Sequence, residues 1–120
     1  MTSLRPGVRA VRRAAAEVAG DAVRQGARVH RIGPAATKAE LLADFARALE
    51  FPDWVGPNWD ALSDALRDLS WLPEGLHVVV WTGASITDPP AYETALEVLQ
   101  FATASSAGTD RPLTILLAGS

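Results

Sequence analysis

The chain has 120 residues, a formal net charge of −3, 48% hydrophobic residues and 21% charged residues. This length and composition are typical of one soluble globular domain, and no apolar run approaches the roughly 18 residues that a membrane span needs. The absence of cysteine excludes disulfides, thiolate metal sites and cysteine nucleophiles. It also agrees with a reducing compartment, so we expect a cytoplasmic protein.

The charges are distributed unevenly along the chain. Residues 1–32 carry seven arginines against Glu17 and Asp21, a net +5, whereas residues 33–120 carry four basic and twelve acidic groups, a net −8. An acidic body disfavours nucleic acid as a ligand and favours a basic partner. The Arg-rich N-terminus lacks the apolar segment of a secretory signal. An organellar transit peptide and an arm for RNA or a membrane surface remain alternatives for it.

The first element that we expect is a helix from Pro6 to about Gln25, because proline suits the first turn of a helix and Gly26 suits its end. Small apolar residues recur there at a spacing of three or four, namely Val8, Val11, Ala15, Val18 and Ala22. We expect this helix to form an N-terminal extension over residues 1–26 that packs weakly on the acidic body or contacts a partner.

Residues 27–120 have the pattern of an α/β domain. Strands are expected at Ala27–Ile32, Leu76–Trp81 and Leu113–Ala118, with two helices before the second strand, a loop over residues 83–87, and one helix before the third strand. The apolar run LHVVVW is typical of a strand paired on both sides, and Arg28 and Arg31 favour an edge position for the first strand. We therefore predict a three-stranded parallel sheet, with Leu76–Trp81 in the middle and helices packed against it.

The stretch Phe51–Leu69, FPDWVGPNWDALSDALRDL, combines an aromatic loop, a turn and a short helix. At about 100° per residue, the apolar residues of this helix share one side. They are Trp59, Leu62, Leu66 and Leu69, and the opposite side gathers Asp60, Asp64 and Asp68. Like charges four residues apart destabilise an isolated helix by roughly 0.2–0.5 kcal/mol per pair. The spacing therefore favours a cationic group facing the helix, although a solvated helix face is the plain alternative.

The run Pro52–Leu66 also carries a resemblance to a known family. It contains a proline and an acid, then a ring residue, a glycine and an asparagine, and then the pattern Asp-Ala-Leu-x-Asp-x-Leu. In these features, and in the strand that ends at Trp81, the chain resembles barstar, the intracellular protein inhibitor of a bacterial secreted ribonuclease. The resemblance covers roughly Ala27–Ala118 and implies a barstar-like α/β fold.

The resemblance also implies a function, a partner and a set of contact residues. The function is stoichiometric inhibition of a basic ribonuclease, whose active site is blocked by the acidic helix and the preceding loop. In the family, the second aspartate of the motif replaces the substrate's phosphate, and this role falls on Asp64. Trp54 matches a ring residue that packs on the enzyme. The full set of expected contacts is Trp54, Val55, Gly56, Asn58, Asp60, Asp64, Asp68 and Trp71.

Within this set, we expect Gly56 to supply a backbone angle that other residues avoid and Asn58 to tie the turn down. Two positions depart from the family pattern. Val55 stands where the family has a second ring residue, and Ala104 stands where it has an acid late in the last helix. These departures predict a lower affinity or a different partner.

Other functions are less well supported. A non-inhibitory interaction module for another cationic partner is the main alternative. Catalysis is disfavoured, because Asp60 and Asp64 are neighbours on one helix and such pairs rarely flank a substrate as glycosidase carboxylates do. His30 and His77 lie on expected strands, where a packing or edge role is commoner than zinc binding. We therefore expect no catalytic residue, metal, cofactor, nucleic acid or membrane partner, and a monomer.

Overall fold

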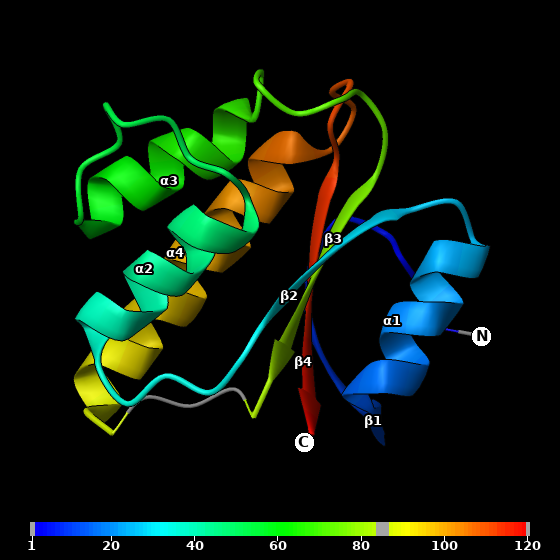
Figure 1. Cartoon of the computed structure of the whole chain (residues 1–120), viewed down its shortest axis with the longest axis horizontal. Helices are drawn as coiled ribbons and strands as arrows, with labels where there is room; N and C mark the ends of the chain where they lie inside the picture. The colour runs from blue at the N-terminus through cyan, green and yellow to red at the C-terminus, as the bar shows by residue number, and fades with distance from the viewer. Residues whose placement is uncertain (1, 84–86, 120) are drawn as a thin grey trace.

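The computed structural model describes residues 2–83 and 87–119 and shows an α/β fold with one parallel sheet (Figure 1). In chain order the elements are β1 (Gly7–Ala14), α1 (Ala15–Arg24), β2 (Arg28–Ile32), α2 (Lys38–Ala48), α3 (Trp59–Asp68), β3 (His77–Thr82), α4 (Pro89–Ser106) and β4 (Leu113–Gly119). The strand order is β1-β4-β3-β2. Helix α1 covers one face of the sheet, and α2, α3 and α4 lie on the other (Figure 1). Within the described ranges, no helix is long and apolar enough to cross a membrane.

The three strands expected within residues 27–120 are confirmed as β2, β3 and β4. Strand β3 pairs with β2 on one side and β4 on the other, and all its residues except Thr82 are buried. Strand β2 lies at one edge of the sheet, with Arg28 and Arg31 exposed. Of the expected loop over residues 83–87, positions 84–86 lie outside the described residues.

The sheet has four strands, not three, and the expected N-terminal helix is wrong over its first half. Residues 7–14 form β1, which pairs with β4 from Gly7↔Thr114 to Ala10↔Leu117, and only Ala15–Arg24 is helical. The spacing of three between Val8 and Val11 fits a helix, but in a strand it sends the two side chains to opposite faces. Both faces are covered here. Val8 packs on the side of α2, α3 and α4, and Val11 packs on the side of α1.

The apolar core lies on both faces of the sheet and fixes α3 in place. Leu62 and Leu66 of α3 are each 1% exposed. They belong to a cluster that also contains Phe45 of α2, Leu99 of α4 and Trp81 of β3. Burying a leucine side chain contributes roughly 1.5–3 kcal/mol, so α3 is held firmly against its neighbours while its other side faces solvent.

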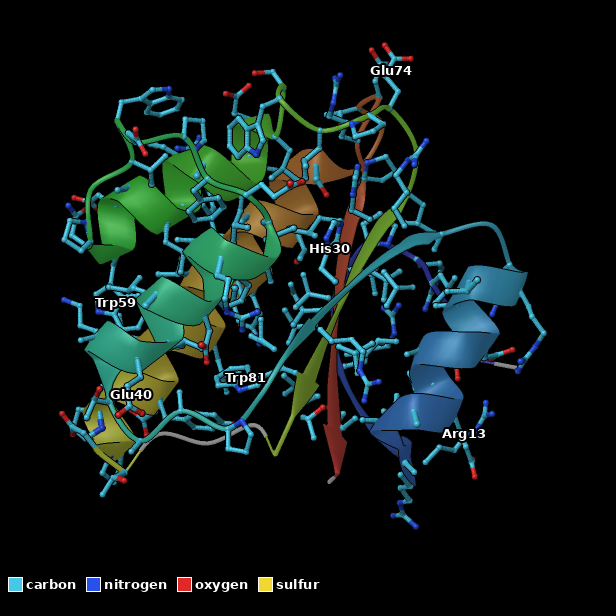
Figure 2. The ribbon with its side chains drawn as sticks, viewed as in Figure 1. Arg13, His30, Glu40, Trp59, Glu74 and Trp81 are labelled. Atoms are coloured by element: carbon cyan, nitrogen blue, oxygen red, sulfur yellow. The ribbon has the colours of Figure 1, made fainter. Side chains whose placement is uncertain are left out.

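Arg13 and Arg24 form ion pairs with acidic residues of α1. Arg13 forms ion pairs with Glu17 at 3.5 Å and with Asp21 at 3.3 Å. The backbone N–H of Thr2 also donates to Asp21, and this hydrogen bond is the main reason that the pKa of Asp21 lies below its usual value. Figure 2 shows Arg13 beside α1, on the opposite side of the sheet from α3. The positive charge of Arg13 therefore neutralises acidic residues of α1 and does not reach the aspartates of α3.

Candidate partner-binding site

Helix α3 begins at Trp59 because Asn58 caps it. Asn58 has an extended backbone, and its Oδ1 accepts a hydrogen bond from the backbone N–H of Ala61 at 2.8 Å. The expectation that Asn58 ties the turn down is therefore confirmed. The helix ends at Asp68, and Leu69 caps it with a left-handed φ of 51°, which is unusual for a bulky side chain. Because Leu69 is fully buried, packing of its side chain offsets the cost of this conformation.

Replacing Asn58 by alanine should therefore destabilise the protein by about 1 kcal/mol, since it removes the oxygen that caps the first turn. Asn58→Ser retains a capping oxygen and is the matched control. Urea unfolding of the two variants measures the difference. Equal stability of the alanine and serine variants would contradict the role assigned to this cap.

The three aspartates lie on the solvent side of α3, as helical spacing predicts. Asp60 and Asp68 are exposed, and the side chain of Asp64 is 67% exposed. Arg67, one turn further along α3, donates a hydrogen bond to Oδ1 of Asp64. Asp68 accepts one from the hydroxyl of Ser70 at 3.2 Å. Asp60 lies in the first turn, where the positive end of the helix dipole favours a carboxylate.

A hollow of about 520 Å³ opens beside Asp60 and Asp64, between α3 and α4. Its lining consists of Trp59, Asp60, Ser63, Asp64, Arg67, Glu97, Val98 and Phe101. Phe101 of α4 is 57% exposed, and the guanidinium carbon of Arg67 lies 5.2 Å from the centre of its ring. We call this hollow the α3–α4 groove. It combines three carboxylates with aromatic surface, a composition suited to a cation.

Sequence reasoning did not assign Arg67, Glu97 or Phe101 to the site. One signal was available for Phe101, because α4 buries Leu99, Ala102 and Thr103. Phe101 falls outside that buried stripe. The exposure of Phe101 could therefore be read from the helical spacing of α4, whereas its place in the groove could not.

Trp54, in the loop before α3, and Trp71, after the end of α3, are in contact with each other. Trp54 is 68% exposed, and its ring meets that of Trp71 edge to face, with centroids 6.1 Å apart. Trp71 is partly buried, donates its indole N–H to the carbonyl of Leu49 at 2.9 Å, and contacts Phe51. Trp71 is thus fixed in the fold and supports the exposed ring of Trp54.

Val55 and Gly56 line a different hollow, of about 250 Å³, between the loop and α2. Gly56 is not among the glycines with a positive φ, so the expected unusual backbone angle is wrong. A side chain at this position would instead place its Cβ 3.1 Å from Nδ2 of the Asn58 side chain. Gly56 therefore leaves room for the residue that caps α3.

Trp59 lies on the inner side of α3, and Ala104 lies on the solvent side of α4. Trp59 is partly buried and packs against the main core, and the ammonium of Lys38 lies 5.1 Å from the centre of its ring. Figure 2 shows Trp59 between the starts of α2 and α3. Ala104 is exposed on α4, so no carboxylate extends from that position.

The two histidines pack against each other across β2 and β3. Nε2 of His30 lies 2.9 Å from Nδ1 of His77, and Nε2 of His77 lies 2.8 Å from the carbonyl oxygen of Pro73. A carbonyl only accepts, so His77 donates from Nε2 and accepts from His30 at Nδ1. Burial and the neighbouring His77 lower the pKa of His30 to about 4. Across residues 2–83 and 87–119, no group of three or more potential metal ligands comes together.

Comparison with known proteins agrees with the pattern read from Pro52–Leu66. The family model described as barstar (barnase inhibitor) matches residues 27–118. A search of curated proteins finds no significant match. The matched region contains α2, α3, α4, β2, β3 and all of β4 except Gly119, and therefore every residue of the candidate site. The resemblance is confirmed, and the chain belongs to the barstar (barnase inhibitor) family.

Proposed function

We propose that this protein inhibits a basic ribonuclease of the barnase type by inserting α3 and the preceding loop into the enzyme's active site. The observation that carries the proposal is the exposed row of Asp60 and Asp64 on a helix whose other side is buried at Leu62, Ala65 and Leu66, in a member of a family of inhibitors. We expect the protein to act in the cytoplasm of the cell that makes the ribonuclease, without catalytic activity of its own.

Charge complementarity is the physical basis of the proposal. An active site that binds the phosphates of RNA presents lysine, arginine or histidine side chains, and a carboxylate satisfies the same hydrogen-bond donors. Asp64 extends from the middle of α3, beyond the first turn where the helix dipole is strongest. Its carboxylate is exposed and pairs with the exposed side chain of Arg67, an ion pair weak enough for a cationic partner to displace. The buried leucines beneath keep the helix rigid while it binds.

Trp54 supports the proposal from the loop that precedes α3. Its exposed ring packs edge to face against Trp71, and Trp71 is fixed by its hydrogen bond to the backbone carbonyl of Leu49. An aromatic side chain that is already positioned loses little conformational entropy when it binds. We propose that Trp54 packs on the ribonuclease beside the carboxylates, while Asp68, Val55 and Gly56 lie at the edge of the contact.

The second candidate is a non-inhibitory interaction module that binds another cationic protein through the same face. Exposed Ala104, which replaces an acid of the family pattern, and Val55, which replaces a ring, favour it. Both changes remove contacts that inhibition uses in the family. This candidate predicts a complex that leaves ribonuclease activity intact.

Titration of a purified barnase-type ribonuclease with the protein separates the two candidates. Inhibition predicts that RNA cleavage falls in proportion to added protein and ends at one inhibitor per enzyme. A ribonuclease of unrelated fold is the control and should keep its activity. Full cleavage at micromolar concentrations of the protein would overturn the inhibitor proposal, and a complex with full activity would support the interaction module.

A further inference from the structure

Arg67 lines the α3–α4 groove, where it contacts Asp64 and Phe101. We propose that Arg67 determines the specificity of this site, because its guanidinium occupies the groove in the free protein and a cationic side chain of the partner must displace it. This inference rests on the proposed role of α3 as the partner-binding helix. In this view the aspartates of α3 attract the cationic partner, and Arg67 competes with the partner for the same carboxylates.

The contacts of Arg67 are those of a bound arginine. Its Nη2 donates to Oδ1 of Asp64, and its guanidinium carbon lies 5.2 Å from the centre of the Phe101 ring. Asp60 and Glu97 complete the acidic lining around it. A carboxylate and an aromatic face are the two groups that recognise guanidinium most strongly in proteins.

These contacts also explain why the arginine can leave. The side chain of Arg67 is 39% exposed, and exposed ion pairs at this spacing are weak. Displacing Arg67 thus lowers affinity only modestly, while its positive charge opposes any cation that approaches Asp64. Because the ion pair and the ring contact of Arg67 are both lost when the partner binds, they lower the affinity for the partner by roughly three- to tenfold.

Arg47 of α2 forms an ion pair of the same spacing outside the groove and is therefore the control for Arg67. It pairs with Asp44 three residues earlier at 3.5 Å, and its side chain is 66% exposed. Arg47 and Arg67 therefore share the same spacing and the same charge. Arg67 alone belongs to the lining of the α3–α4 groove and meets an aromatic ring. An effect of Arg67 that Arg47 does not share must come from the groove.

The test compares Arg67→Gln with Arg47→Gln, using N-acetyl-arginine amide as a small cationic probe. NMR titration should show the backbone signals of Asp64 and Phe101 saturating at a probe concentration three- to tenfold lower in Arg67→Gln than in the wild type. Arg47→Gln should behave as the wild type. The same half-saturation in both variants would overturn the inference.

A second measurement separates this inference from the proposed function. Arg67→Gln should inhibit a barnase-type ribonuclease roughly three- to tenfold more tightly than Arg47→Gln, since both variants lose one positive charge. Equal inhibition by the two variants would contradict Arg67 as a determinant of specificity. If no variant inhibits, the proposed function fails, and the arginine probe alone decides whether Arg67 occupies the groove.

Discussion

Asp64→Ala should weaken inhibition of the ribonuclease by at least about 30-fold, the effect expected of a charged residue at the centre of an interface. Asp64 is the middle carboxylate of α3 and borders the α3–α4 groove. Its removal leaves the enzyme's cations desolvated and without a partner. The inhibition constant at fixed ionic strength measures the change.

The control for this prediction is Glu17→Ala, which removes one exposed negative charge from α1 on the opposite face of the sheet. It should change inhibition less than about threefold, because a distant charge acts only through screened long-range attraction. Thermal unfolding of Asp64→Ala should stay close to that of the wild type, since Asp64 makes only an exposed ion pair. Equal losses of inhibition in the two variants would show that net charge, not Asp64, governs binding.

Acidification should destabilise the fold through His30 and His77. The folded pKa of His30 is about 4, below its usual 6.5, so the unfolded chain takes up a proton first as the pH falls. The stabilisation is therefore complete above about pH 6.5 and is lost progressively towards pH 4. At 1.36 kcal/mol per pKa unit, and reduced because the ring is only partly buried and solvent screens its charge, the loss from His30 is on the order of 1–3 kcal/mol. The pKa of His77 is also lowered, which acts in the same direction.

The surroundings of His30 and His77 explain why the pKa values of both side chains are lowered. Burial is the largest cause for both histidines, and the charges of Arg28 and Arg111 oppose protonation of His77. The carbonyl of Pro73 favours a proton on His77, and the backbone of Ala48 favours one on His30. These hydrogen bonds reduce the shifts without reversing them.

Urea unfolding of the wild type and of His30→Gln at pH 7 and pH 4.5 measures this effect. The wild type should lose about 1–3 kcal/mol more than the variant, because glutamine does not titrate. Asp21 also destabilises the fold in acid, since its pKa is lowered, but it does so equally in both proteins. Equal losses in the wild type and in His30→Gln would contradict the role assigned to the histidine pair.

The sequence predicts the fold well where the apolar pattern is local. The run LHVVVW and the capped helices α2 and α3 show their structure within a few residues. Strand β1 could not be read in this way, because its partner β4 lies at the other end of the chain. Its arginines and small residues also fit a helix. Only the pairing with β4 selects the strand, in which Val8 and Val11 pack against opposite faces of the sheet.

The same distinction applies to the candidate site. Helical spacing alone places Asp60, Asp64 and Asp68 on the exposed side of α3. The α3–α4 groove depends on how two helices pack, so spacing within α3 does not reveal that Glu97 and Phe101 stand opposite Asp64. For the same reason, the pairing of Trp54 with Trp71 follows from the path of the loop and not from the motif.

In the proposed complex, α3 takes the place of RNA in the active site of a basic ribonuclease. Displacement of a fluorescent, non-cleavable oligonucleotide from a barnase-type enzyme shows whether the inhibitor and RNA share one site. The wild-type protein should release one oligonucleotide for each molecule that binds, and Asp64→Ala should require at least about 30-fold more protein. Formation of a complex in which the oligonucleotide stays bound to the enzyme would contradict this arrangement.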